Sequence, residues 1–126
     1  AGSAIAHALV MADVAELAVH DPDAQRQQAL VQRLAGLGRT RVRAASADPR
    51  GFDIALNASP AGMRDGDPLP IDPRHLHPGQ FVGCVITAPA VPPLIVAARS
   101  LGCPTMTGAD MFARVRDLMV DFLLAR

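Results

Sequence analysis

The sequence predicts an α/β domain built on a doubly wound parallel sheet. Three observations favour this class: strand and helix patterns alternate along the chain, the connections between them are short, and residues 81–86 form a continuous apolar run, as in strands covered on both faces. Half of the 126 residues are hydrophobic and the only aromatic residues are four phenylalanines. A core of small aliphatic side chains in one small domain is therefore expected.

Charge and hydropathy exclude several classes of protein. Twelve arginines balance 11 aspartates and one glutamate, and lysine is absent. The arginines are scattered, whereas nucleic-acid binding needs a clustered cationic face. No apolar run approaches the roughly 20 residues that cross a bilayer, and the first residues lack the basic region of a signal peptide. We expect a cytoplasmic protein in which Cys84 and Cys103 are buried thiols.

The first half of the chain predicts helix, strand, helix and strand. Helical spacing of apolar residues covers 2–11, and a short apolar run follows at 17–19. Asp21 and Pro22 are expected to be the N-cap and first turn of a second helix that Gly36 and Gly38 close. The apolar face of that helix is expected to comprise Leu30, Val31, Leu34 and Leu37. A second strand is expected at 41–45.

The second half continues the alternation. Residues 53–58 and 81–86 are predicted strands, and the segment 62–79 between them is dense in proline, glycine and aspartate and predicts a loop. A helix opens at Pro92 and stops at Gly102, and 104–106 is a short strand. The last helix carries an apolar stripe expected to face the core, formed by Met111, Val115, Leu118 and Phe122.

The order of elements is unusual at its beginning. A doubly wound nucleotide-binding domain opens with a strand that lies in the middle of its sheet, whereas this chain opens with a helix. Without that strand the sheet would divide and leave unpaired backbone groups. We therefore expect residues 1–126 to be one dinucleotide-binding domain of a longer chain.

Four segments carry a resemblance to a known family. Residues 1–6, 57–63, 89–94 and 108–112 resemble, in order and spacing, the C-terminal NAD(P)-binding half of shikimate and quinate dehydrogenases. The resemblance implies a Rossmann-like fold and hydride transfer between a nicotinamide cofactor and a hydroxylated cyclohexene or cyclohexane carboxylate. In that family a lysine and an aspartate of the N-terminal substrate domain handle the proton. This chain has no lysine, so we assign it no catalytic residue.

Asp21 is the residue that bears on the choice of cofactor. It follows a strand about 20 residues after the expected phosphate turn, where a carboxylate accepts from the ribose hydroxyls and repels a 2′-phosphate. This favours NAD. The alternative is that Asp21 only caps the next helix. Arg26 lies one turn into that helix, which keeps NADP as the second candidate cofactor.

The first helix would present its positive end to the cofactor pyrophosphate. Gly2 allows close approach of the backbone, and Ser3 supplies a hydroxyl. The alternative is an ordinary core helix.

The segment from Asn57 to Met63 follows a predicted strand, at the edge of the sheet where open α/β proteins bind ligands. Gly62 permits a positive φ there. The resemblance implies that this segment borders the nicotinamide and its ribose, and its candidate contacts are Asn57, Ala58, Ser59, Pro60 and Met63. The alternative is a polar turn after a strand.

The resemblance also assigns residues after the next strand and in the last helix. The backbone at Val85, Thr87 and Gly108 would receive the nicotinamide amide, and Met111 would pack on the ring. Cys84 and Thr87 stand where the family usually has aspartate and tyrosine, and Val115 stands where a glutamine contacts the substrate. These departures leave the identity of the substrate open.

Other functions remain as alternatives. The chain could be a non-catalytic dinucleotide-binding or dimerisation module of the same fold, or a cousin such as methylene-tetrahydrofolate dehydrogenase or glutamyl-tRNA reductase. His75 and His77 lack partners at metal-ligand spacing, and the nearby aspartates lack the pattern of a calcium loop, so no metal is expected. The expected partner is a small shikimate-like substrate, with a homodimer left open.

Overall fold

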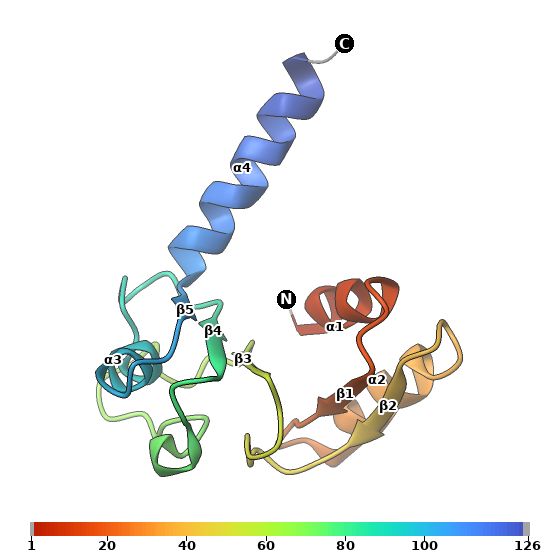
Figure 1. Ribbon diagram of the computed structural model, residues 1–126, viewed down its shortest axis with the longest axis horizontal. Coiled ribbons are helices and arrows are strands. Elements are labelled where there is room, and N and C mark those ends of the chain that lie inside the picture. The colour runs from red at the N-terminus through yellow and green to blue at the C-terminus, as the bar shows by residue number, and fades with distance from the viewer. Residues whose placement is uncertain (1, 125–126) are drawn as a thin grey trace. The chain divides into compact units, whose positions relative to one another are not determined.

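A computed structural model describes residues 2–124 of the chain (Figure 1). The chain divides into two compact units, an N-terminal unit, Ala1–Asp48, and a C-terminal unit, Pro49–Arg126. Every strand pair in the described residues is parallel, with the order β1-β2 in one sheet and β3-β4-β5 in the other. The predicted α/β class with parallel pairing is therefore confirmed within each unit.

The N-terminal unit follows the predicted order of elements. Its elements are α1 (Gly2–Met11), β1 (Glu16–Val19), α2 (Ala24–Leu34) and β2 (Arg41–Ala44). Leu17 of β1 pairs in register with Val42 of β2. Both pack against the small buried cluster that the two helices supply, Ala6, Val10 and Leu34. Helix α1 thus covers the sheet through its apolar face.

Helix α2 differs from the prediction at both ends. Its N-cap is Asp23, not Asp21: the Asp23 carboxylate accepts from the backbone N–H of Gln25 at 2.9 Å and of Arg26 at 3.2 Å. Asp21 and Asp23 are both good capping residues, and the pattern did not distinguish them. The helix ends at Leu34 because Ala35 is extended (φ −61°, ψ 129°), and Gly36, with a φ of +83°, completes a turn that the Leu37 N–H closes on the Leu34 carbonyl at 3.2 Å. Leu37, predicted on its face, lies beyond the helix and is 49% exposed.

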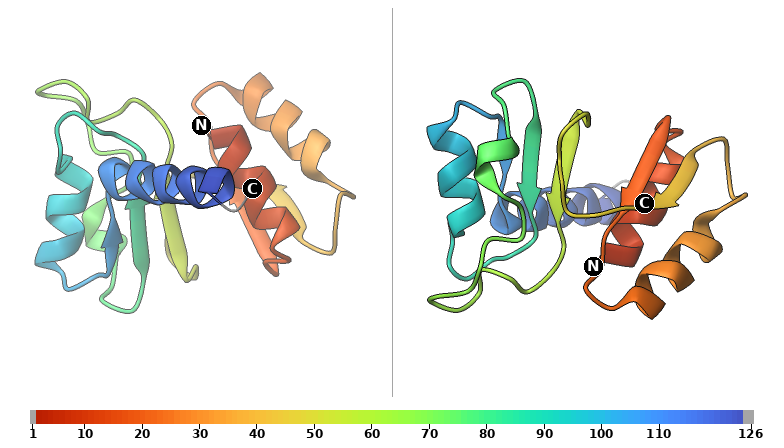
Figure 2. Two further views of the ribbon diagram at one scale, coloured as in Figure 1. Left: turned by 90° about the horizontal axis from the view of Figure 1, so that it is seen from above. Right: turned by 90° about the horizontal axis from the view of Figure 1, so that it is seen from below.

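The C-terminal unit contains a three-stranded sheet. It comprises β3 (Ile54–Asn57), β4 (Phe81–Cys84) and β5 (Thr105–Met106), with α3 (Pro93–Ser100) packed on β4 and β5 (Figure 2). Its core includes Val82, Leu94 and Ile95, all nearly inaccessible to solvent. Both cysteines are buried free thiols, as predicted. Because β3 and β4 pair in parallel, their carboxyl ends lie side by side.

The predicted loop at 62–79 contains a short 3₁₀ helix, η1 (Pro73–His75). The Asp72 carboxylate caps it by accepting from the backbone N–H of Arg74 at 3.0 Å. Proline at its first position supplies a preset φ. The same prolines and aspartates that predicted an irregular loop thus build one helical turn.

Helix α4 (Gly108–Leu124) corrects the prediction that its apolar stripe faces the core. Val115, Leu118 and Phe122 are 48%, 50% and 61% exposed. The helix is anchored at its start, where Gly108 is buried, and extends away from the sheet of its own unit (Figure 1). The periodicity of the sequence predicted an apolar face correctly, but it could not predict which part of the protein packs against that face. No described helix is both long and apolar enough to cross a membrane.

Candidate functional site

The carboxyl end of β1 presents Asp21. One oxygen of its carboxylate accepts from the backbone N–H of Asp23 at 2.8 Å and lies 3.3 Å from Nη2 of Arg26. The Asp21 side chain is 29% exposed. Because Asp23 caps α2, the alternative that Asp21 only caps this helix is wrong. Its carboxylate stands at the strand end, the position that the sequence predicted for contact with a ribose.

Arg26 is shared between two carboxylates. Its Nη2 reaches Asp21, and its Nε lies 3.7 Å from an oxygen of Asp23. The guanidinium is 72% exposed, so it remains accessible from solvent. A 2′-phosphate approaching Arg26 would meet both carboxylates at the same place, which is unfavourable for like charges.

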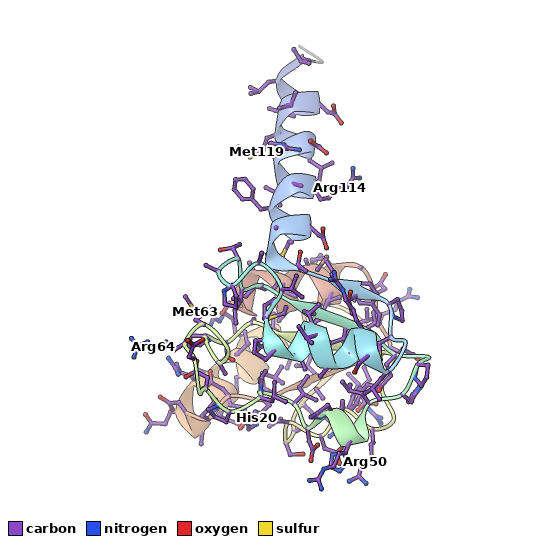
Figure 3. All side chains as sticks on the ribbon, turned by 90° about the vertical axis from the view of Figure 1, so that its left-hand side faces the viewer. His20, Arg50, Met63, Arg64, Arg114 and Met119 are labelled. Carbon is purple, nitrogen blue, oxygen red and sulfur yellow. The ribbon has the colours of Figure 1, made fainter. Side chains whose placement is uncertain are left out.

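Sequence reasoning missed Gln27 at this edge of the sheet. Its side-chain amide donates to the backbone carbonyl of Val19 at 2.6 Å and of Ala45 at 2.8 Å. Nδ1 of His20, which Figure 3 labels, lies 3.2 Å from the same Ala45 oxygen. Nothing in the helical pattern distinguishes Gln27 from its neighbours Gln25 and Gln28. Only the structure shows that one of the three reaches the strands.

Gly2 and Ser3 lie in the first turn of α1, where the sequence placed the positive end of the helix dipole. Gly2 is half-buried and Ser3 is exposed. Their contact with a pyrophosphate stays a prediction.

A second edge forms in the C-terminal unit, where three predicted segments meet. The backbone N–H of Val85 donates to the carbonyl of Asn57 at 3.1 Å and so extends the pairing of β3 and β4. Gly62, in the loop after β3, lies close to the residues that follow β4: a Cβ built on it would lie 3.4 Å from Cδ1 of Ile86. A Cβ on Gly108 would lie only 2.3 Å from the carbonyl oxygen of Val85. The segments at 57–63, 85–87 and 108–111 are therefore neighbours, as the family resemblance implies.

Buried Asn57 shapes the loop that follows β3. Its Oδ1 accepts from the backbone N–H of Ser59 at 3.1 Å and from the Ser59 hydroxyl at 2.6 Å. Its Nδ2 lies 3.4 Å from the carbonyl oxygens of Ser59 and Ala61 and 3.4 Å from Sγ of Cys84. Both the oxygen and the nitrogen of the Asn57 side-chain amide thus bind the loop, and the buried side chain fixes the conformation of that loop. The contact of Asn57 with a cofactor stays a prediction.

Asp67 holds the far end of the same loop. Its carboxylate accepts from the backbone N–H of Gly62 at 3.0 Å and of Arg64 at 3.1 Å. These two bonds, that of Gly62 first, lower the pKa of Asp67 below its ordinary value of 3.8. Met63 and Arg64 lie on this loop, and both side chains are exposed (Figure 3). The loop is therefore fixed at both ends before any ligand binds.

A reciprocal cap fixes the start of α4. The backbone N–H of Thr107 donates to the Asp110 carboxylate at 2.9 Å, and the Asp110 N–H donates to the Thr107 hydroxyl at 3.1 Å. Hydrogen bonds from Thr107, that of its backbone first, lower the pKa of Asp110. This cap fixes the first turn of α4, on which Met111 lies.

The remaining predicted contacts differ in exposure. Pro60 and Thr87 are exposed, whereas the half-buried residues are Ala58, Ser59, Val85 and Met111. Within residues 2–124, no group of three or more metal-ligating side chains comes together. The second edge is therefore a partly apolar surface that also presents a hydroxyl at Thr87 and the half-buried side chain of Met111.

The chain is similar to known dehydrogenases over most of its length. No protein-family model matches the sequence. The chain is 36% identical over 117 residues, 88% of its length, to shikimate dehydrogenase (NADP(+)) of Streptomyces avermitilis, and it covers 40% of that protein. It is 36% identical over 118 residues, 87% of its length, to quinate/shikimate dehydrogenase (NAD(+)) of Corynebacterium efficiens, and it covers 41% of that protein. The chain thus spans about two fifths of the length of these relatives.

Two solved structures resemble the fold. Quinate dehydrogenase from Corynebacterium glutamicum in complex with NAD matches with a TM-score of 0.79 at 35% identity, over 87% of this chain and 41% of that one. Ligand-free 5-ketofructose reductase of Gluconobacter sp. strain CHM43 matches with a TM-score of 0.87 at 25% identity, over 98% of this chain and 47% of that one. The match to the 5-ketofructose reductase, over 98% of this chain, therefore includes the ends of β1, β3 and β4 described above.

Proposed function

Because the chain belongs to the shikimate/quinate dehydrogenase family, we propose that it is the NAD(P)-binding part of an oxidoreductase of this kind. In this role it holds the dinucleotide while hydride moves between the nicotinamide and a hydroxylated cyclohexene or cyclohexane carboxylate. The nicotinamide, when bound, supplies the hydride chemistry. The residues of this chain bind and orient it.

The observation that carries this proposal is the placement of Asp21. Its carboxylate stands at the carboxyl end of a parallel strand and is not used to cap α2. A carboxylate there accepts hydrogen bonds from the two hydroxyls of an adenosine ribose. NAD is the preferred cofactor in this proposal, and NADP is the second, because Arg26 is exposed beside Asp21.

The second edge takes the nicotinamide end in this proposal. In it the loop from Asn57 to Met63 borders the nicotinamide ribose, and the backbone at Val85 and Gly108 receives the nicotinamide amide. The bond from Val85 to Asn57 and the close approach of Gly108 to Val85 support this, because they bring these segments together. Met111 packs against the ring. Because loop and helix start are already fixed by Asn57 and Asp110, little ordering cost accompanies binding.

A specific observation supports a second candidate substrate, a polyhydroxylated ketone. The match to 5-ketofructose reductase covers 98% of this chain, and α4 carries apolar Val115 where the family resemblance implies an amide for a ring hydroxyl. A substrate without that hydroxyl would not need the amide.

Two measurements on the full-length protein test the proposal. Calorimetric titration with NAD and NADP should show binding, with NAD tighter, and the change in nicotinamide absorbance should report turnover of quinate or shikimate. Faster turnover with 5-ketofructose would favour the second candidate substrate. Binding without turnover would favour the non-catalytic module, and absence of binding to both cofactors would contradict the proposal.

A further inference from the structure

We propose that Gln27 is a positioning residue for the adenosine end of the cofactor. Its side-chain amide ties the ends of β1 and β2 to the first turns of α2 and so sets where Asp21 stands. This inference rests on the proposed function, since it concerns how the ribose-binding carboxylate is held.

Both hydrogens of the Gln27 amide nitrogen are used. One bond reaches the carbonyl oxygen of Val19 at 2.6 Å, and the other reaches that of Ala45 at 2.8 Å. The same Val19 oxygen also accepts from the backbone N–H of Ala45 at 2.9 Å, the bond that closes the β1–β2 ladder. Gln27 is half-buried. A planar amide at this point fixes the separation of the two strand ends, because it has one donor for each carbonyl.

A short series of bonds links this amide to Asp21. Gln27 fixes the first turns of α2 on the strands, and Asp23 caps the same turns through the N–H groups of Gln25 and Arg26. The N–H of Asp23 in turn donates to the Asp21 carboxylate at 2.8 Å. Displacement of α2 from the strand ends would therefore move Asp21 as well. The Gln27 amide thus adds a second restraint on Asp21, besides the two-residue connection from Val19 at the end of β1.

A purely structural role for Gln27 predicts a different result from a positioning role. Loss of folded protein lowers the amount of binding for NAD and NADP alike and leaves the ratio of their dissociation constants unchanged. Displacement of Asp21 weakens NAD, which uses the carboxylate, and relieves the repulsion that the carboxylate exerts on the 2′-phosphate of NADP. The ratio of the two constants therefore separates the two roles.

The test compares Gln27→Met with Gln28→Met in the full-length protein, by calorimetric titration with NAD and NADP and by thermal unfolding. Gln28 is exposed and adjacent on the same helix, so it is a matched control. We expect Gln27→Met to raise the dissociation constant of NAD about three- to tenfold, the scale of one or two hydrogen bonds, with a smaller change for NADP. Gln28→Met should leave both constants as in the wild type.

An unchanged ratio of the NAD and NADP constants in Gln27→Met would overturn the positioning role. If this variant does not fold, Gln27→Asn takes its place, since it keeps an uncharged amide but is one methylene group shorter, so it does not span both carbonyl oxygens as Gln27 does. A wild type that binds neither cofactor would overturn the proposed function itself, so the two failures are distinguishable.

Discussion

Gly108 lies directly against Val85: a Cβ on Gly108 would come within 2.3 Å of the Val85 carbonyl oxygen and 2.5 Å of that of Ile86. The first residue of α4 therefore touches the backbone that follows β4. This contact places the start of α4 beside the proposed nicotinamide position.

The first prediction concerns that contact. Gly108→Ala should lower the free energy of unfolding by about 1–3 kcal/mol, the usual scale of overpacking, and should weaken NAD binding, because only backbone atoms stand in the way of the added methyl group. Gly38→Ala is the control, since its Cβ would meet its nearest neighbour at an ordinary 3.5 Å. Denaturant unfolding and calorimetry give the two quantities, and equal stability of the two variants would contradict the prediction.

A second prediction concerns Asn57. Asn57→Asp keeps the acceptor for Ser59 but loses the Nδ2 donor that faces the Ser59 and Ala61 carbonyls. We expect a loss of about 1–3 kcal/mol in unfolding free energy and weaker NAD binding, since the loop is no longer fixed. Ser59→Ala, which removes one hydroxyl bond to Asn57, should cost less. Wild-type NAD affinity in Asn57→Asp would show that the loop does not depend on this amide.

A third prediction concerns pH. The pKa of Asp67 lies below 3.8 in the folded protein because the N–H groups of Gly62 and Arg64 donate to it. The stabilisation from a depressed carboxyl pKa is present above the ordinary value and is lost as pH falls through the lowered one. The melting temperature of Asp67→Ala should therefore fall below that of the wild type at neutral pH and approach it on acidification below 3.8. Asp65→Ala is the charge control, and a difference from wild type that persists in acid would contradict this assignment.

A fourth prediction concerns the substrate. Val115→Gln would restore the amide that the family resemblance implies, and it should raise turnover of shikimate relative to quinate through a term of about 1–2 kcal/mol. Val115 is 48% exposed, so a longer polar side chain fits without repacking. Steady-state kinetics of wild type and variant measure this ratio. Efficient shikimate oxidation that is the same in both proteins would show that Val115 does not contact the substrate.

Local sequence patterns were sufficient for much of the fold. Periodicity gave α1 with the observed bounds, and runs of apolar residues located β3 and β4. The turn at Gly62 was predicted from its residue type and has a φ of +108°. These features depend on neighbours in sequence, which is why they can be read from it.

Features that depend on tertiary contacts could not be predicted. The N-cap of α2 is Asp23, and the sequence could not identify it because Asp21, two positions earlier, is an equally good capping residue. The reach of Gln27 to both strand ends depends on how α2 lies on the sheet. The sequence of α4 predicted an apolar face correctly. It could not predict that Phe122 on this face is 61% exposed, because burial depends on which other elements pack against the helix.

The most direct test of the central claim is the difference between NAD and NADP affinity in wild type and Asp21→Ala, measured by calorimetry on the full-length protein. Asp21 stands at the end of β1 and is held there by the N–H of Asp23. NAD should bind more tightly than NADP to the wild type, and Asp21→Ala should narrow the difference by about 1–3 kcal/mol, the scale of charge-assisted hydrogen bonds. A wild-type preference for NADP, or a difference that survives the substitution unchanged, would contradict the assignment of Asp21 to the adenosine ribose.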